Sequence, residues 1–169
     1  MNKQHLLSLL NQKEMNLRVA SIPGNSDDLS AVLIIHLACE KIIETWIEAA
    51  TNKPDFFSNV SSITFYSKLQ IAKNLSLPDT PFDFMKTLNK IRNKFAHQIT
   101  KNKVSDDEIN ELYNSLSHYL ESQPENDPKR LHCISYGKEY TFNDGNNVKL
   151  SMMFSCVFLS IYHGAGLMG

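Results

Sequence analysis

A long run of apolar residues at helical spacing constrains the fold of this chain more than any other feature. Between residues 28 and 50 an apolar residue recurs every three or four positions. Ser26-Asp27-Asp28 precedes the run and supplies a helix cap and first-turn acids. Because the period is that of an α-helix, the sequence predicts a central helix from Ser26 to about Ala50. Its predicted core positions are Val32, Ile35, Cys39, Ile42, Ile43, Trp46 and Ala50.

Helix starts recur along the rest of the chain. Thr80 can cap a helix whose first position is Pro81, where the missing N–H does no harm. Ser105 and Glu108 match the capping-box pattern, in which each side chain bonds the other residue's backbone N–H. A turn is expected over 22–25, where Ile-Pro-Gly-Asn ends the first helix. The predicted helices cover 1–19, 26–50, 61–74, 80–98 and 105–120.

A hairpin and a last helix are expected near the end. Residues 131–136 and 139–142 flank Gly137-Lys138, which favours two short strands joined by a two-residue turn. A lone hairpin is marginally stable, so it must pack on the helices or pair with another chain. A helix over 149–163, capped by Asn146 or Asn147, is apolar nearly all round, which predicts burial in the core or in a subunit contact.

Length and composition set the domain count. A chain of 169 residues, 42% hydrophobic and 21% charged, can form one globular core. We therefore expect a single mainly α domain over 1–169, with a helical core over 28–122 and a hairpin plus C-terminal helix over 131–165. No apolar run reaches the length of a membrane span or a secretory signal, so the expected location is the cytoplasm.

Cysteine, histidine and glycine patterns give no reason to expect a cofactor. The three cysteines, Cys39, Cys133 and Cys156, contain no Cys-x-x-Cys and are expected to be reduced packing residues. The histidines lack the spacing of a zinc site, and no glycine-rich phosphate loop is present. The sequence therefore predicts neither a bound metal nor an organic cofactor.

One segment departs from the charge balance of the whole chain. The net charge is −1, yet residues 84–105 contain six basic residues and no acid. Such a local excess attracts a polyanion, although a solvated helix face is the alternative. The candidate RNA contacts are Lys86, Lys90, Lys94, Lys101 and Lys103.

Arg92, Asn93 and His97 lie within this basic segment and are the candidate catalytic residues. In RNA cleavage, a His can accept the 2′-hydroxyl proton or protonate the leaving oxygen, while an Arg neutralises charge on the phosphate. Asn93 would orient a phosphate oxygen or the imidazole. On one helix Arg92 and His97 point about 140° apart. They share a site only if Arg92 reaches round, the helix end frays, or a two-fold dimer pairs two copies.

The alternative is that these residues have structural roles only. The aliphatic stem of Arg92 would then cover an apolar edge, and His97 would stabilise the negative end of its helix. Glu40, on the polar side of the central helix, is expected to be a surface acid, although it could also pair with a base near the cleft.

The sequence resembles the HEPN superfamily of compact helical domains. The resemblance covers about 28–122 and rests on three motifs: Ala38-x-Glu40-Lys41, Phe65-x2-Lys68-Leu69-x-Ile71-Ala72, and Leu88-x2-Ile91-Arg92-Asn93-x-Phe95-Ala96-His97. The last contains the Arg-x4-His signature with a polar residue after the Arg. The resemblance implies a HEPN-like helical bundle, a homodimer, and a metal-independent endoribonuclease with a toxin or defence role.

The last of these motifs is also similar to HEPN-related bacterial families with a regulatory role, including proteins related to the mannitol operon repressor. That similarity implies the alternative function, a non-catalytic regulatory or protein-binding dimer, for instance in transcription regulation. HEPN toxins that are controlled by a nucleotidyltransferase antitoxin usually carry a Tyr two residues after the His, and this chain has Ile99 there. Because this Tyr is absent, an antitoxin or regulatory partner is not expected to control this chain by modifying a Tyr at that position.

Overall fold

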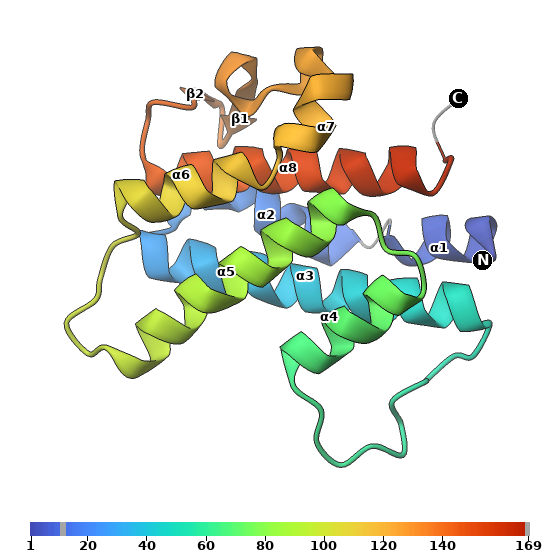
Figure 1. Cartoon of the computed structure of the whole chain (residues 1–169). Coiled ribbons are helices and arrows are strands. Elements are labelled where there is room, and N and C mark those ends of the chain that lie inside the picture. Colours follow the sequence, from blue (N-terminus) through green and yellow to red (C-terminus); the bar gives the residue numbers. More distant parts are fainter. Residues whose placement is uncertain (11–12, 168–169) are drawn as a thin grey trace.

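The computed structural model describes residues 1–10 and 13–167 (Figure 1). Within them the chain is mainly α, as predicted: eight α-helices, two 3-10 turns and one hairpin. The α-helices are α1 (Lys3–Leu10), α2 (Lys13–Asn25), α3 (Asp28–Thr51), α4 (Phe65–Asn74), α5 (Asp79–His97), α6 (Asp106–Asn114), α7 (Ser117–Ser122) and α8 (Asn146–Gly164); the strands are β1 (His132–Ser135) and β2 (Lys138–Thr141).

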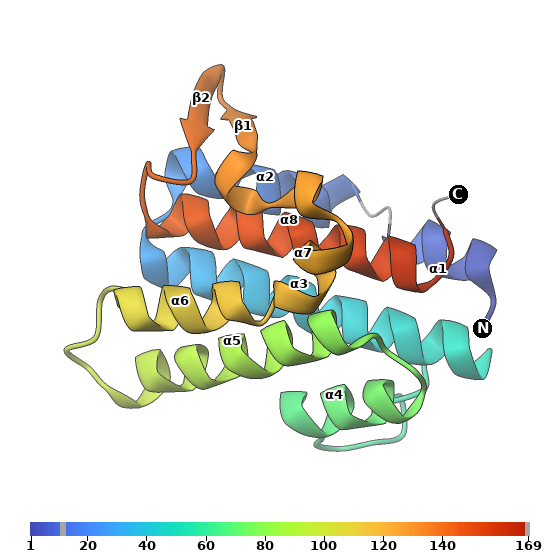
Figure 2. The same ribbon diagram turned by 45° about the horizontal axis from the view of Figure 1, so that its top comes forward.

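The predicted central helix is confirmed as α3. Figures 1 and 2 show it in the middle of the bundle, and α1, α2, α4, α5 and α8 all pack against it. Its cap is Asp27, whose side chain accepts the N–H of Ser30 at 2.7 Å. Six of the seven predicted core positions are buried: Val32, Ile35, Cys39, Ile42, Ile43 and Trp46.

The predicted turn over 22–25 is wrong, because α2 continues to Asn25. Ile22 is fully buried, and the Asn147 side-chain amide donates to the carbonyl oxygens of Ile22 and Pro23. The Ile22 carbonyl also accepts the N–H of Ser26, whereas the bond to Pro23 satisfies a carbonyl that the end of a helix otherwise leaves to solvent. Residues 11–12, inside the helix predicted over 1–19, lie outside the described residues.

Two other helices start or break differently from the prediction. α5 begins at Asp79 after Pro78, so Thr80 and Pro81 lie in its first turn and Thr80 is not the cap. The capping box of Ser105 and Glu108 is confirmed. The helix predicted over 105–120 is divided into α6 and α7. At the break the N–H of Leu116 bonds the carbonyl oxygen of Tyr113, three residues back, so the four-residue pattern of the α-helix is interrupted.

The hairpin is confirmed, with a turn one residue earlier than expected. Ser135 pairs with Lys138, so the turn is Tyr136-Gly137, and both residues have positive φ. A two-residue turn of this hand needs positive φ at both positions and places Gly second. The Ser135 hydroxyl donates to the carbonyl oxygen of Ala20 at 2.9 Å, which fixes the hairpin on α2. The hairpin therefore packs on the helices, the first of the two expected arrangements.

The last helix, α8, is largely buried, as its apolar sequence predicts. It starts after Gly145, and neither Asn146 nor Asn147 caps it. Both side chains instead tie neighbouring segments together: Asn146 donates to the carbonyl oxygen of Val104, and Asn147 binds the end of α2. Among the described residues, no helix is both long and apolar enough to cross a membrane.

The three cysteines are free, as expected for packing residues. Cys39 and Cys156 are buried, and Cys133 is half-buried. Burial raises the pKa of the Cys156 thiol to about 12. Burial also raises the pKa of the Cys39 thiol, so neither buried sulfur is a ready nucleophile.

Candidate functional site

A polar hollow of about 520 Å³ lies where α3, α4 and α5 meet. Two rows of polar side chains line it, and each row follows helical spacing. His36 and Glu40 are four residues apart on α3, and Asn89, Arg92 and Asn93 fall within four residues on α5, so each row occupies one face of its helix. The start of α4 forms the third wall with Thr64, Phe65 and Tyr66.

The core beneath α5 fixes which residues face the hollow. Leu88 and Ile91 are buried, so the helix cannot rotate without exposing them. With that stripe against the core, Asn89, Arg92 and Asn93 lie at its margin toward α4. The amphipathic pattern that predicts α5 therefore also places three polar side chains in one wall.

His36 is a buried imidazole in the wall of the hollow. It is 7% exposed, its Nε2 lies 3.0 Å from Asn89 Oδ1, and its ring centroid is 4.1 Å from that of Phe65. Burial lowers the pKa of His36, and the nearby Arg92 lowers it further, against the opposite effects of Asn89 and Glu40. Because an amide oxygen only accepts, Nε2 of His36 donates to Asn89 Oδ1 and holds this oxygen toward α3.

Arg92 is half-buried at the hollow, and its guanidinium lacks an ionic partner. Its Nη1 donates to Asn93 Oδ1 at 3.3 Å, and no carboxylate of the described residues lies within ion-pair distance of it. A partly buried cation normally has an anionic partner, because removal from water is costly. The predicted pair of Arg92 and Asn93 is therefore brought together, with donors still available.

Glu40 belongs to this site: it pairs with a base beside the hollow, the second of the two roles expected for it, and is not a free surface acid. Lys68 of α4 reaches across to α3 and donates to Glu40 at 2.8 Å and to Glu44 at 2.6 Å. The Lys68 side chain is only 11% exposed, and both carboxylates are about 30% exposed. The side of α3 that was expected to face solvent is covered here, because α4 packs on it.

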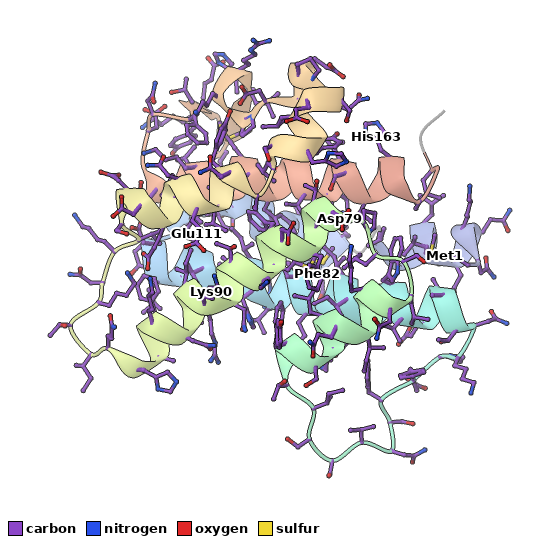
Figure 3. The ribbon with its side chains drawn as sticks, viewed as in Figure 1. Met1, Asp79, Phe82, Lys90, Glu111 and His163 are labelled. Carbon is purple, nitrogen blue, oxygen red and sulfur yellow. The ribbon has the colours of Figure 1, made fainter. Side chains whose placement is uncertain are left out.

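Three of the five predicted RNA-binding lysines are paired with acids of α6. Lys90 lies 3.1 Å from Glu111, a pair that Figure 3 shows between the two helices. Lys94 and Lys101 both bind Glu108, at 2.9 and 2.8 Å. Packing of α6 on α5 thus neutralises much of the basic segment. Lys86 and Lys103 have no ion pair among the described residues.

The environment of Glu108 is the strongest electrostatic feature next to the site. Burial by itself raises the pKa of this carboxyl group. Hydrogen bonds from Lys101, the Ser105 N–H and Lys94 outweigh burial and lower the pKa to about 2. Glu108 is therefore a fixed anion that holds α6, the preceding loop and the end of α5 together.

His97 is not in the hollow. It is the last residue of α5, its side chain is exposed, and it makes no hydrogen bond or ion pair with the described residues. One chain thus joins Arg92 and Asn93 but leaves His97 more than a turn away, as the helical angles predict.

Sequence reasoning did not identify His36, Asn89 and Tyr66 as site residues. The spacing of Asn89, Arg92 and Asn93 is a signal that was present in the sequence. His36 and Tyr66 carry no comparable signal, because their place depends on how α3 and α4 pack against α5.

Within the described residues no three His, Cys, Asp or Glu side chains gather as a metal-binding group. Comparison of the chain with known protein families, with curated proteins and with solved structures finds no match.

Proposed function

We propose that two copies of this chain form a metal-independent endoribonuclease in which Arg92 and Asn93 hold the phosphate and His97 transfers protons. The observation that carries the proposal is the half-buried guanidinium of Arg92 at a polar hollow, which has no ionic partner in the part of the chain that the structure describes. On the same helix, Lys90 and Lys94 are paired with acids. Lys86, also on α5, has no ion pair, but its ammonium lies over the Phe82 ring and does not line the hollow. At the hollow itself, Arg92 is the cation available to an external anion, and its planar fork matches a phosphate.

The chemistry needs only these groups and the RNA itself. The ribose 2′-oxygen attacks the adjacent phosphorus, the P–O5′ bond breaks, and a 2′,3′-cyclic phosphate and a 5′-hydroxyl form. The imidazole of His97 accepts the 2′-hydroxyl proton, and the imidazolium so formed gives a proton to the leaving O5′. Arg92 balances the charge that develops on the phosphoryl oxygens. Because His97 lies away from the hollow in one chain, the His97 of a second copy supplies proton transfer.

The exposed side of α3 offers a contact for that second copy. Leu29, Leu33 and Leu37 are spaced four residues apart and are 38%, 41% and 60% exposed. Leu33 and Leu37 are seven and three residues before Glu40, so this apolar stripe runs along the helix face that leads to the hollow. A two-fold contact on the stripe would bring two hollows near one another. An activity of this kind suits a toxin or defence component restrained by a partner protein.

The test is RNA cleavage in the presence of EDTA. Purified protein is incubated with bulk tRNA and mRNA, and the fragments are analysed for cyclic phosphate ends. We expect the wild type to cleave RNA, and so should the matched control Gln98→Ala, which changes the exposed residue beside His97. His97→Ala and Arg92→Ala should lose cleavage. Arg92→Lys, which keeps the charge without the fork, should cleave weakly. Intact RNA with the folded wild-type dimer, or full activity in His97→Ala, would contradict the proposal.

The second candidate is a non-catalytic regulatory or protein-binding dimer. One observation favours it: no carboxylate of the described residues orients His97, which lies exposed at the end of its helix. This function predicts no cleavage by any variant, and loss of a protein partner when Leu33 and Leu37 are replaced by polar residues. RNA cleavage separates the two candidates, and the oligomeric state measured on the same samples checks that each contains the dimer that both require.

A further inference from the structure

We propose that the hollow beside Arg92 binds a guanine base, whose Watson–Crick edge is read by Glu40 and whose ring stacks on Tyr66. The inference rests on the proposed function, since it names the nucleotide next to the phosphate held by Arg92. It goes beyond that function because phosphate binding and proton transfer require no particular base.

The hydrogen bonds inside the hollow leave it rich in donors. Asn89 Oδ1 is occupied by His36, and Asn93 Oδ1 is occupied by Arg92. The side-chain NH₂ groups of both asparagines and the remaining N–H groups of Arg92 are therefore left to donate. The phosphate needs only part of this set. The remaining N–H groups can therefore donate to acceptor atoms elsewhere on the same ligand.

Glu40 is the one carboxylate among the described residues that line the hollow. Its Oε1 accepts from Lys68, and no described group bonds its Oε2. Lys68 is shared with Glu44, which does not line the hollow. The hollow thus combines several donors with one fixed acceptor group, and the ligand should present adjacent N–H groups beside acceptor atoms.

Guanine has this pattern. Its N1–H and N2–H₂ groups lie side by side, so a carboxylate accepts both, and its O6 and N7 atoms accept from an arginine or an amide. Adenine and cytosine present one amino group beside an acceptor nitrogen, and uracil presents one N–H between two carbonyl groups. None of these three gives a carboxylate two adjacent donors.

Tyr66 provides a surface for the ring of the base. It is 40% exposed at the start of α4 and lines the hollow next to the buried Phe65. Single-stranded RNA is commonly bound by stacking of unpaired bases on such aromatic side chains. The polar floor and the aromatic rim together suit a nucleotide better than a phosphate alone.

The test measures the dissociation constants of 3′-GMP, 3′-AMP, 3′-CMP and 3′-UMP by calorimetry or NMR. We expect 3′-GMP to bind the wild type about tenfold more tightly than the other three, as a good bidentate contact allows. Glu40→Gln should reduce this preference to about twofold. Glu44→Gln is the matched control, because it removes the other partner of Lys68 without altering the hollow, and it should keep the preference. Tyr66→Leu should weaken all four nucleotides, and thermal unfolding checks that each variant is folded.

Several outcomes would overturn the inference: equal binding of all four nucleotides, no binding of any, or the same loss in Glu40→Gln and Glu44→Gln. Failure of the proposed function is a separate result. Selective 3′-GMP binding without RNA cleavage would keep the guanine site and refute the nuclease. Cleavage without preference for a base, unchanged in Glu40→Gln, would keep the nuclease and refute the guanine site.

Discussion

Replacement of Glu108 by Gln should make the free energy of unfolding less dependent on pH in the acid range. The folded state lowers the pKa of this carboxyl group from 4.5 to about 2, so its ionised form stabilises the fold. At about 1.4 kcal/mol for each pH unit, the difference corresponds to about 3 kcal/mol. Because the folded pKa is depressed, this contribution is complete above pH 4.5 and disappears as the pH falls through about 2. At pH 3 about 1.4 kcal/mol should remain.

The variant separates charge from capping. Gln also serves at the third position of a capping box, so Glu108→Gln keeps the bond to the Ser105 N–H and loses the ion pairs with Lys94 and Lys101. We expect Glu108→Gln to lower the free energy of unfolding by at most about 3 kcal/mol at pH 7, because the retained Ser105 bond contributes part of the pKa shift, and to leave it nearly unchanged at pH 2. The measurement is urea denaturation followed by circular dichroism over this pH range.

Glu111→Gln is the control, since Glu111 pairs with Lys90 in an exposed ion pair of the same two helices. It should cost less than about 1 kcal/mol. The reasoning fails if the two variants lose equal stability at pH 7, or if the wild type and Glu108→Gln lose the same free energy between pH 7 and pH 2.

Three further predictions concern the core, the hollow and the hairpin. Phe84 is fully buried, so Phe84→Ala should cost about 3–5 kcal/mol in urea denaturation, whereas Ile99→Ala, at an exposed position, should change stability by less than about 0.5 kcal/mol. An NMR titration of the imidazole of His36 should give a pKa below 6.5, because burial lowers the pKa more than the hydrogen bond to Asn89 raises it; Asn89→Ala, which removes that bond, should lower the pKa further, and a value above 6.5 would contradict the geometry. Gly137 has a φ of 76°, so Gly137→Ala should destabilise the hairpin by about 1 kcal/mol, seen as faster amide exchange in β1 and β2.

The fold could be predicted where the signal is local. The capping box at Ser105 depends on residues three positions apart, and the helical run of α3 depends on its own period, so both are readable from the sequence. The break at Ser115 could not be predicted in this way, because Ser21 and Ser160 bond a carbonyl oxygen three residues back inside unbroken helices, so a serine alone does not mark a helix end. The end of α2 depended on Asn147, a residue more than a hundred positions away.

The candidate site likewise contains some residues that the sequence reveals and others that only the folded chain brings together. Arg92, Asn93 and His97 stand out because a cation, an amide and an imidazole are close in sequence, and helical angles correctly separated His97 from Arg92. His36 reaches Asn89 only through the packing of α3 on α5, 53 residues apart. The pairing of Lys90, Lys94 and Lys101 within the basic segment could not be predicted for a related reason, because the acids that bind them belong to α6 and contact them only in the folded chain.

The protein contains a single tryptophan, Trp46, and its position makes it an internal reporter. Trp46 is 2% exposed on α3, and its Nε1–H donates to the carbonyl oxygen of Leu75, just after α4, at 3.1 Å. If α4 separates from α3, the indole of Trp46 loses this hydrogen bond and becomes exposed to water. The same movement displaces Phe65 and Tyr66, which α4 places at the hollow. Its emission should then shift to longer wavelength before the helices unfold. Intrinsic fluorescence, without an added label, can therefore follow the opening and closing of this wall when a ligand is titrated.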